Sequence, residues 1–210
     1  METLSVLMMV AFFVGVPVLA VWAMIHSTRK MRTQFERLAA NLGLRIDPPE
    51  PPRGFTAAPP SLVGSIRGKA VKIHTYSTGS GKSRTTWTEV VVTPVLAGDM
   101  TFGFTREGFG TRVMQLFGAK EIKVGNREFD EAWFVQTNQP DFLRAALLPE
   151  LQQKFRPFRG ACKLEKGLVT YTERGLLANE ATRHRFEQAM ELACDLADLA
   201  EVQARHAAKG

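Results

Sequence analysis

Three carboxylates and one histidine are the residues whose types best suit proton transfer. Asp130 and Glu131 follow closely on Glu128, and His74 lies on a separate strand-like run. A carboxylate and an imidazole can act as general acid and base when the fold brings them within hydrogen-bond reach of a substrate. One hypothesis is therefore a hydrolase or transferase with a site assembled from dispersed residues, Asp130 and His74 among them. The alternative is that the carboxylates bind neighbouring backbone amides or basic side chains.

A glycine-rich stretch at residues 78–83 (TGSGKS) is similar in composition to a phosphate-binding loop. The pattern GxxxxGK[ST] requires glycine at position 76, where this chain has Tyr76, and it must lead from a strand into a helix. Here it leads into residues 85–88 (TTWT), which are typical of a strand. We therefore interpret the stretch as the tip of a β-hairpin, and we expect no nucleotide or other cofactor.

Metal binding is considered at one predicted helix face, where Glu180, His184 and Glu187 recur at helical spacing. These residue types can ligate a transition metal. They also belong to an acidic stripe, continued by Asp195 and Asp198, that we expect to face solvent. No second group of ligands is evident, so no metal site is predicted.

The two cysteines, Cys162 and Cys194, do not have the spacing of metal ligands. We interpret both as small core residues, one on a strand and one on a helix. A disulfide between them would require an oxidising compartment.

Basic residues gather at two places that could contact an anionic surface. Each such residue contributes about 1 kcal/mol beside an anionic leaflet. The alternative for the first group is that it stops translocation, and for the second that it is a solvated loop. The two groups are Arg29, Lys30 and Arg32, and Lys154, Arg156 and Arg159.

The charge of the folded part argues against nucleic-acid binding. From Ser61 onward the chain has 21 Lys and Arg against 17 Asp and Glu, a net charge of +4. A nucleic-acid binder normally carries a dense basic stripe.

Residues 4–25 (LSVLMMVAFFVGVPVLAVWAMI) are 22 residues without a charge. As a helix they would be about 33 Å long, close to the roughly 30 Å hydrocarbon core of a bilayer. A cleaved signal peptide would have a basic start and a shorter apolar run. The segment therefore predicts a transmembrane helix that contacts the lipid bilayer.

The basic residues that follow this segment predict its orientation. Five Lys and Arg lie within about 20 residues after it and none precedes it, so the positive-inside rule applies. We expect a single-pass protein of the inner (plasma) membrane, with the N-terminus outside and the C-terminal domain in the cytoplasm.

Between the anchor and the main domain the sequence predicts a helix and a linker. Apolar residues from Met31 to Leu42 recur at helical spacing, and Gly43 is typical of a helix end. The spacing does not decide whether this helix lies on the headgroups or packs against the domain. Residues 47–60 hold six of the eleven prolines and predict an extended spacer. The expected divisions are 1–27 (anchor), 28–45 (juxtamembrane amphipathic helix), 46–61 (Pro-rich linker) and 62–210 (soluble α+β domain).

The main domain reads as an antiparallel sheet covered by helices on one face, including a long C-terminal amphipathic helix. Asn138, with Asp141 three residues later, and Asn179 are predicted helix caps. Lys166 and Gly167 are expected to connect a hairpin. Strands are predicted over 69–77, 87–95, 101–105, 128–137, 161–165 and 168–172, and helices over 111–117, after 138, from Pro149, and over 180–204.

Residues 125–131 (GNREFDE), followed by Phe134-Val135 and by Leu-Leu-Pro at 147–149, have a familiar order. The stretch resembles a family of bacterial single-pass membrane-anchored proteins of unknown function. The resemblance covers about residues 65–200 and implies a bacterial inner-membrane setting. It implies no activity and no site residues.

Taken together, the sequence favours a membrane-tethered cytoplasmic binding or scaffolding module of unknown specificity, without an evident catalytic site. A protein partner at the membrane is the expected ligand, and no nucleic acid is expected. The alternative is the membrane-anchored hydrolase or transferase described above.

Overall fold

Alternating β-branched residues build one large antiparallel sheet. The computed structural model describes residues 18, 29–48, 60–96, 98–106 and 120–209. Within these residues the sheet has nine strands in the order β1-β2-β3-β4-β9-β8-β5-β7-β6. Every pairing is antiparallel. The strands are β1 Arg45–Asp47, β2 Ser61–Ile66, β3 Lys69–Thr78, β4 Thr85–Thr93, β5 Phe102–Arg106, β6 Lys120–Ile122, β7 Trp133–Thr137, β8 Ala161–Glu165 and β9 Leu168–Arg174.

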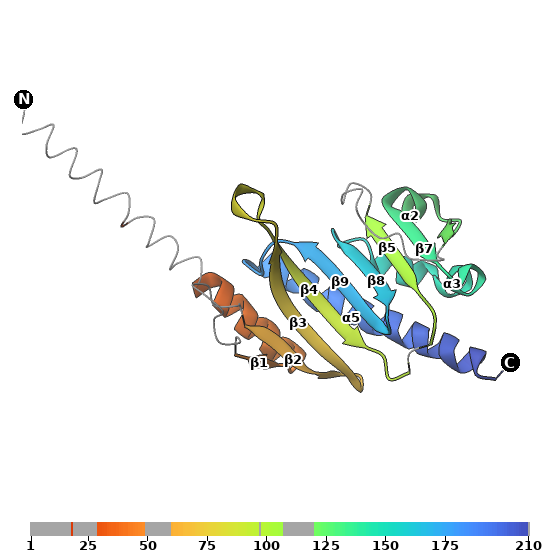
Figure 1. Ribbon diagram of the computed structural model, residues 1–210, viewed down its shortest axis with the longest axis horizontal. Helices are drawn as coiled ribbons and strands as arrows, with labels where there is room; N and C mark the ends of the chain where they lie inside the picture. Colours follow the sequence, from red (N-terminus) through yellow and green to blue (C-terminus); the bar gives the residue numbers. More distant parts are fainter. Residues whose placement is uncertain (1–17, 19–28, 49–59, 97, 107–119, 210) are drawn as a thin grey trace, which may run out of the picture.

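Helices cover one face of this sheet, which confirms the predicted α+β class (Figure 1). The longest, α5, crosses behind the strands and buries an apolar stripe that includes Phe186, Ala193 and Leu196. Asn179 caps α5 by accepting a hydrogen bond from the Thr182 amide, as predicted. α5 spans Glu180–Ala207. The other α-helices of the described residues are residues 29–42, α2 Arg127–Ala132, α3 Pro140–Ala146 and α4 Pro149–Lys154.

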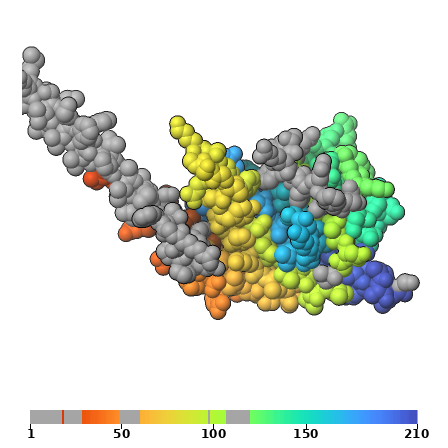
Figure 2. All heavy atoms as spheres, in the orientation of Figure 1, coloured from red at the N-terminus to blue at the C-terminus, as the bar shows by residue number. Residues whose placement is uncertain are grey.

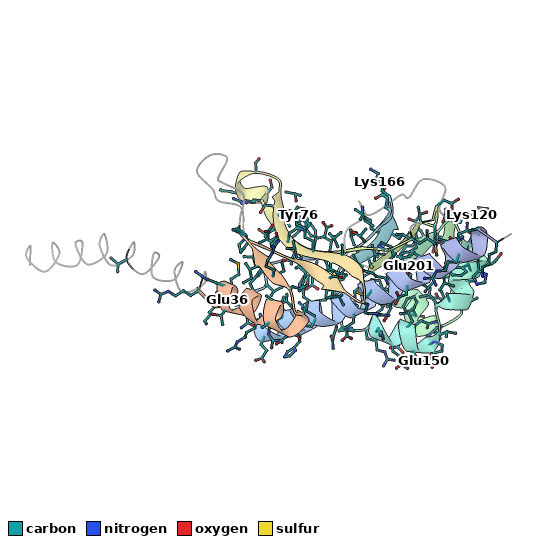
Figure 3. All side chains as sticks on the ribbon, turned by 90° about the horizontal axis from the view of Figure 1, so that it is seen from below. Glu36, Tyr76, Lys120, Glu150, Lys166 and Glu201 are labelled. Atoms are coloured by element: carbon teal, nitrogen blue, oxygen red, sulfur yellow. The ribbon has the colours of Figure 1, made fainter. Side chains whose placement is uncertain are left out.

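The opposite face of the sheet carries polar and aromatic side chains. In the view from below, Tyr76 and Lys166 lie on the side away from Glu150 of the helical layer (Figure 3). The β3–β4 hairpin, with the short 3-10 helix Gly81–Ser83 at its tip, projects from the body of the molecule (Figure 2). The glycine-rich stretch is therefore a hairpin tip that leads into β4, and it does not open an α-helix.

The helix over residues 29–42 packs into the core of the domain. Phe35, Leu38 and Ala39 are buried in the same apolar cluster as the sheet. Asn41 donates to Glu187 of α5 at 2.7 Å. Of the two predicted placements for this helix, packing against the domain is the one observed.

The Pro-rich segment connects two strands that pair with each other. β1 pairs with β2, with Ile46 opposite Leu62. Residues 45–47 are thus part of the sheet, and the structure gives no support for a spacer that separates the helix from the domain. Residues 49–59 themselves lie outside the described residues, as does the helix predicted over 111–117.

No helix within the described residues is both long and apolar enough to cross a bilayer. Residues 4–25 fall outside these residues except for Val18, which is helical.

Two local predictions are wrong. The strand expected over 128–137 is helix α2 in its first half, and only β7 is extended. Asn138 does not cap α3, because its side chain accepts from the Thr101 amide and donates to the Asp99 carbonyl. Gln139 takes the capping position without a side-chain bond, and Pro140 supplies the fixed φ of the first turn.

Candidate functional site

A pocket of about 390 Å³ opens between α2, α4 and the adjoining ends of β5 and β7. Its volume falls within the range of small-molecule sites. The wall combines aromatic and apolar side chains with amides, two arginines and one glutamate. The described residues of this wall include no serine, threonine, cysteine, histidine, lysine or tyrosine, so Glu128 is their one residue of a type commonly used as a nucleophile or for proton transfer.

The α2 wall is built by a turn whose residues satisfy one another. Gly125 has φ +87°, a conformation that favours glycine. Asn126 caps α2 by accepting from the Phe129 amide at 3.4 Å. Asp130 accepts from the Val124 amide at 2.9 Å and from the Gly125 amide at 3.0 Å. The residues of the GNREFDE stretch thus shape the turn that leads into the pocket.

A second chain of hydrogen bonds fixes the amides between α2 and α4. Asn126 donates to the Gln152 side chain at 2.6 Å, and Gln152 donates to the Leu147 carbonyl at 2.7 Å. Gln152 is buried. Because both amides are committed to protein partners, this wall is rigid and preorganised.

Two aromatic rings, Phe129 and Trp133, line the pocket. Phe155, which does not line it, contacts Trp133 edge-on at 5.2 Å between ring centroids and Phe129 at 5.5 Å. All three rings are buried. Edge-to-face pairs of this kind contribute about 0.5–1.5 kcal/mol beyond their buried area. The aromatic side of the pocket is therefore held in place by core packing.

Two arginines border the pocket with different partners. Arg106 donates through Nη1 to the Phe158 carbonyl at 2.5 Å and to the Arg156 carbonyl at 3.3 Å. Its guanidinium lies 5.9 Å from the centroid of the Trp133 ring. Arg156 donates to both carboxylate oxygens of Glu128, at 3.2 and 3.0 Å, and both of these side chains are well exposed. The pocket therefore presents cationic hydrogen-bond donors beside aromatic side chains.

Comparison with known proteins gives a likeness of fold. The chain is similar to the crystal structure of the mycobacterial trehalose monomycolate transport factor A, TtfA. The TM-score is 0.55 at 12% sequence identity, over 81% of this chain and 93% of that one. No protein-family model matches the sequence, and a search of curated proteins gives no significant match. At this identity the likeness shows the fold alone.

The structure does not bring Asp130 and His74 together. His74 lies on β3 and Asp130 beside β7, and these strands are five positions apart in the sheet. Five strand spacings correspond to about 24 Å. Both carboxylate oxygens of Asp130 are also bonded to backbone amides, so the pairing proposed from the sequence is wrong.

On the open face of the sheet, His74 lies in a row of polar side chains with Glu89 and Thr172. His74 Nε2 lies 3.3 Å from Glu89, and Glu89 also accepts from the Thr172 hydroxyl at 2.9 Å. In a nucleophilic triad the imidazole contacts the hydroxyl, whereas here the carboxylate stands between them. Burial lowers the pKa of His74 despite the nearby Glu89. This geometry does not activate Thr172.

The predicted anionic-surface residues lie in separate places. Arg29, Lys30 and Arg32 are on the first helix, and Arg32 pairs with Glu36 at 2.9 Å. In the second group Lys154 binds Asp195 of α5 at 2.5 Å, and Arg156 binds Glu128 at the pocket. Arg159 has no ion-pair partner among the described residues. The second group is therefore largely engaged by the protein itself.

The acidic stripe of α5 is partly a set of ion pairs with the domain, which the sequence did not indicate. Asp195 pairs with Arg67 at 2.6 Å, and Asp198 binds the buried Lys69. At the other end Arg183 contacts Glu187 at 2.5 Å. The Arg183 guanidinium thus pairs with the carboxylates considered as metal ligands, and the described residues contain no group of three or more His, Cys, Asp or Glu side chains that could hold a metal ion.

Both cysteines are free, buried thiols, as expected for core residues. Burial raises the pKa of Cys162 and of Cys194. Neither thiol is therefore an activated nucleophile.

Arg106, Trp133 and Gln152 line the pocket without having been singled out in the sequence. They come from β5, β7 and α4, and only the fold brings them together. The one available signal was the run Gly125-Asn126, which is typical of a turn that starts a helix.

Proposed function

We propose that this chain is a membrane-tethered binding module whose ligand site is the pocket between α2 and α4. The observation that carries the proposal is the make-up of that pocket, in which rigid amides, aromatic rings and two arginines surround a volume of about 390 Å³. Such groups recognise and orient a ligand. The described residues of the wall do not include the paired nucleophile and base that hydrolysis or group transfer requires.

The tether is proposed from the sequence and from the position of the first helix. Residues 4–25 have the length and polarity of a membrane span. The described part of the first helix starts at Arg29, and this helix is packed into the domain. Few residues then separate the span from the domain, so the domain would lie close to the cytoplasmic face, with Arg29 and Lys30 near the headgroups.

The likeness to TtfA supports a role of the same general kind. That protein is named as a transport factor. We propose that this chain likewise acts as an accessory component at a membrane, binding a ligand and leaving chemistry to other proteins.

Site-specific photocrosslinking in cells would test the pocket as the binding site. The full chain would carry p-benzoylphenylalanine at Gln153, which lines the pocket and is exposed, or at Lys82 on the hairpin tip as a matched control. We expect a light-dependent adduct at position 153 alone, and its loss when Ala132→Leu fills the pocket. Equal adducts at both positions, or an adduct that survives Ala132→Leu, would show that the pocket is not the site.

Reporters of topology fused after Gly210 would test the placement separately. Activity of a reporter that works only in the cytoplasm is expected. Activity of one that works only outside the cytoplasm would contradict the proposed orientation and leave the pocket assignment standing.

A further inference from the structure

Arg106 carries a positive charge that no carboxylate among the described residues neutralises. Its side chain is half-buried, and its bonds go to two carbonyl groups and the Trp133 ring. No carboxylate of the described residues lies within ion-pair distance of it. Partly buried arginines usually have an anionic partner, because removing a charge from water is costly. An anion from outside the protein would supply that partner.

The pocket also offers more hydrogen-bond donors than acceptors. A guanidinium has five N–H donors, and the bonds of Arg106 use only Nη1. Arg156 similarly uses only Nη2, on Glu128. The oxygens of Asn126 and Gln152 already accept hydrogen bonds from Phe129 and Asn126. A ligand that matches this wall is therefore rich in acceptors.

Arg156 is paired with Glu128, and a ligand could replace Glu128 in this ion pair. The two side chains are exposed, at 74% and 66%, and exposed pairs contribute only about 0–1 kcal/mol. An oxyanion in the pocket could take over the Arg156 donors at little cost. Glu128 would then act as a competitor that keeps weak or neutral ligands out.

From these features we infer that the pocket binds the phosphate or carboxylate group of a small anionic ligand. Arg106 and Arg156 donate to the oxyanion, and Phe129 and Trp133 contact an apolar or planar part of the same molecule. Bidentate binding of such groups is the particular strength of arginine. The inference rests on the proposed function and adds the chemical class of the ligand.

Calorimetric titration of the full chain in phosphatidylcholine nanodiscs tests this class. The probes are phenyl phosphate, inorganic phosphate and the neutral benzyl alcohol. We expect phenyl phosphate to bind, and Arg156→Gln to weaken it about tenfold, the effect of losing one charge-assisted hydrogen bond. Glu128→Gln should strengthen it a few-fold. Arg127→Gln, a change at an exposed neighbour on α2 that does not line the pocket, should leave it unchanged.

The source of the anion is distinguished by competition. Displacement of phenyl phosphate by inorganic phosphate would indicate a soluble anion. Weaker phenyl phosphate binding in phosphatidylglycerol nanodiscs, with no such effect in Arg156→Gln, would indicate a lipid headgroup. Either result supports an oxyanion site.

Two results would overturn the inference. If benzyl alcohol bound as tightly as phenyl phosphate and ignored both charge changes, the pocket would be an apolar site, and the proposed function would stand without the inferred ligand class. If phenyl phosphate gave no binding heat while the Gln153 photoadduct remained, the ligand would not be a small oxyanion.

Discussion

Two arginines, Arg185 on α5 and Arg106 on β5, show how differently this protein treats a partly buried charge. Arg185 of α5 makes three contacts of 2.5–3.0 Å with Glu173, which also accepts from the Tyr171 hydroxyl at 2.5 Å. Arg106 at the pocket contacts carbonyl groups and a ring, and no carboxylate of the described chain. The first arginine is part of a closed network and the second borders an open volume.

The difference separates structural charges from binding charges. Hydrogen bonding to Glu173 raises the pKa of Arg185, and burial raises the pKa of Tyr171, so at neutral pH the guanidinium stays charged and the phenol stays neutral. Such a network holds α5 to β9. At the pocket no carboxylate of the described residues pairs with Arg106, and a ligand can provide that interaction.

The largest expected effect comes from opening the closed network. Glu173→Ala leaves the partly buried Arg185 without its counter-ion and should lower the free energy of unfolding by about 3–5 kcal/mol. Urea unfolding of the full chain in nonionic detergent measures it. Arg156→Gln, which breaks the exposed pair at the pocket, is the matched comparison and should cost less than about 1 kcal/mol. Similar losses for both would remove the distinction between the two regions.

A somewhat smaller effect is expected at the first helix, which packs beside α5. Leu38→Ala removes a fully buried side chain and should cost about 2–5 kcal/mol, with the lower half of that range expected for a helix at the edge of the core. The same unfolding measurement applies. Arg37→Ala, at the exposed neighbouring position, should change the free energy by less than about 0.5 kcal/mol. An unchanged value for Leu38→Ala would mean that this helix is not part of the fold.

The pocket wall should be less costly to disturb. Asn126→Ala removes the cap of α2 and the partner of Gln152, and we expect a loss of about 1–2 kcal/mol. Binding of phenyl phosphate should weaken more than that loss alone suggests, since α2 carries one side of the site. Arg127→Gln on the same helix should affect neither property. Unaltered binding in Asn126→Ala would separate the turn from the site.

The smallest effect concerns His74 on the open face of the sheet. Its folded-state pKa is lowered by burial, so between pH 7 and 5.5 the unfolded state binds more protons than the folded state. Stability should therefore fall as the pH drops below about 6.5, the ordinary pKa of histidine. His74→Gln should have a shallower decline over that interval. Parallel curves for both proteins would exclude a contribution from His74.

Much of the sheet could be predicted because its strands are long and have a period of two. β3, β4, β8 and β9 follow from alternating branched residues, and the hairpin through Lys166 and Gly167 follows from its turn residues. The long helix α5 follows from its apolar stripe and its Asn179 cap. In these elements local preference and tertiary packing agree.

The elements that were predicted wrongly or not at all are short, and a short element carries too little periodic pattern to be recognised. α2 has six residues, too few to show a helical period. Because the aromatic residues of β7 follow it directly, the whole stretch was predicted as a strand. β1 has three residues and is recognisable only through its partner β2. The site could not be predicted because Arg106 and Arg156 are fifty positions apart and meet only through the order of β5, β7 and α4.

The most direct test of the pocket as the binding site uses the three tryptophans of the chain as reporters. In the full protein labelled with 5-fluorotryptophan, Trp133 reports on the pocket, Trp87 on the open face of the sheet, and Trp22 on the N-terminal segment. Titration with phenyl phosphate, followed by fluorine NMR, should shift and saturate the Trp133 resonance and leave Trp87 and Trp22 unchanged. A saturating shift of Trp87 with none at Trp133 would place binding on the open face and contradict the account.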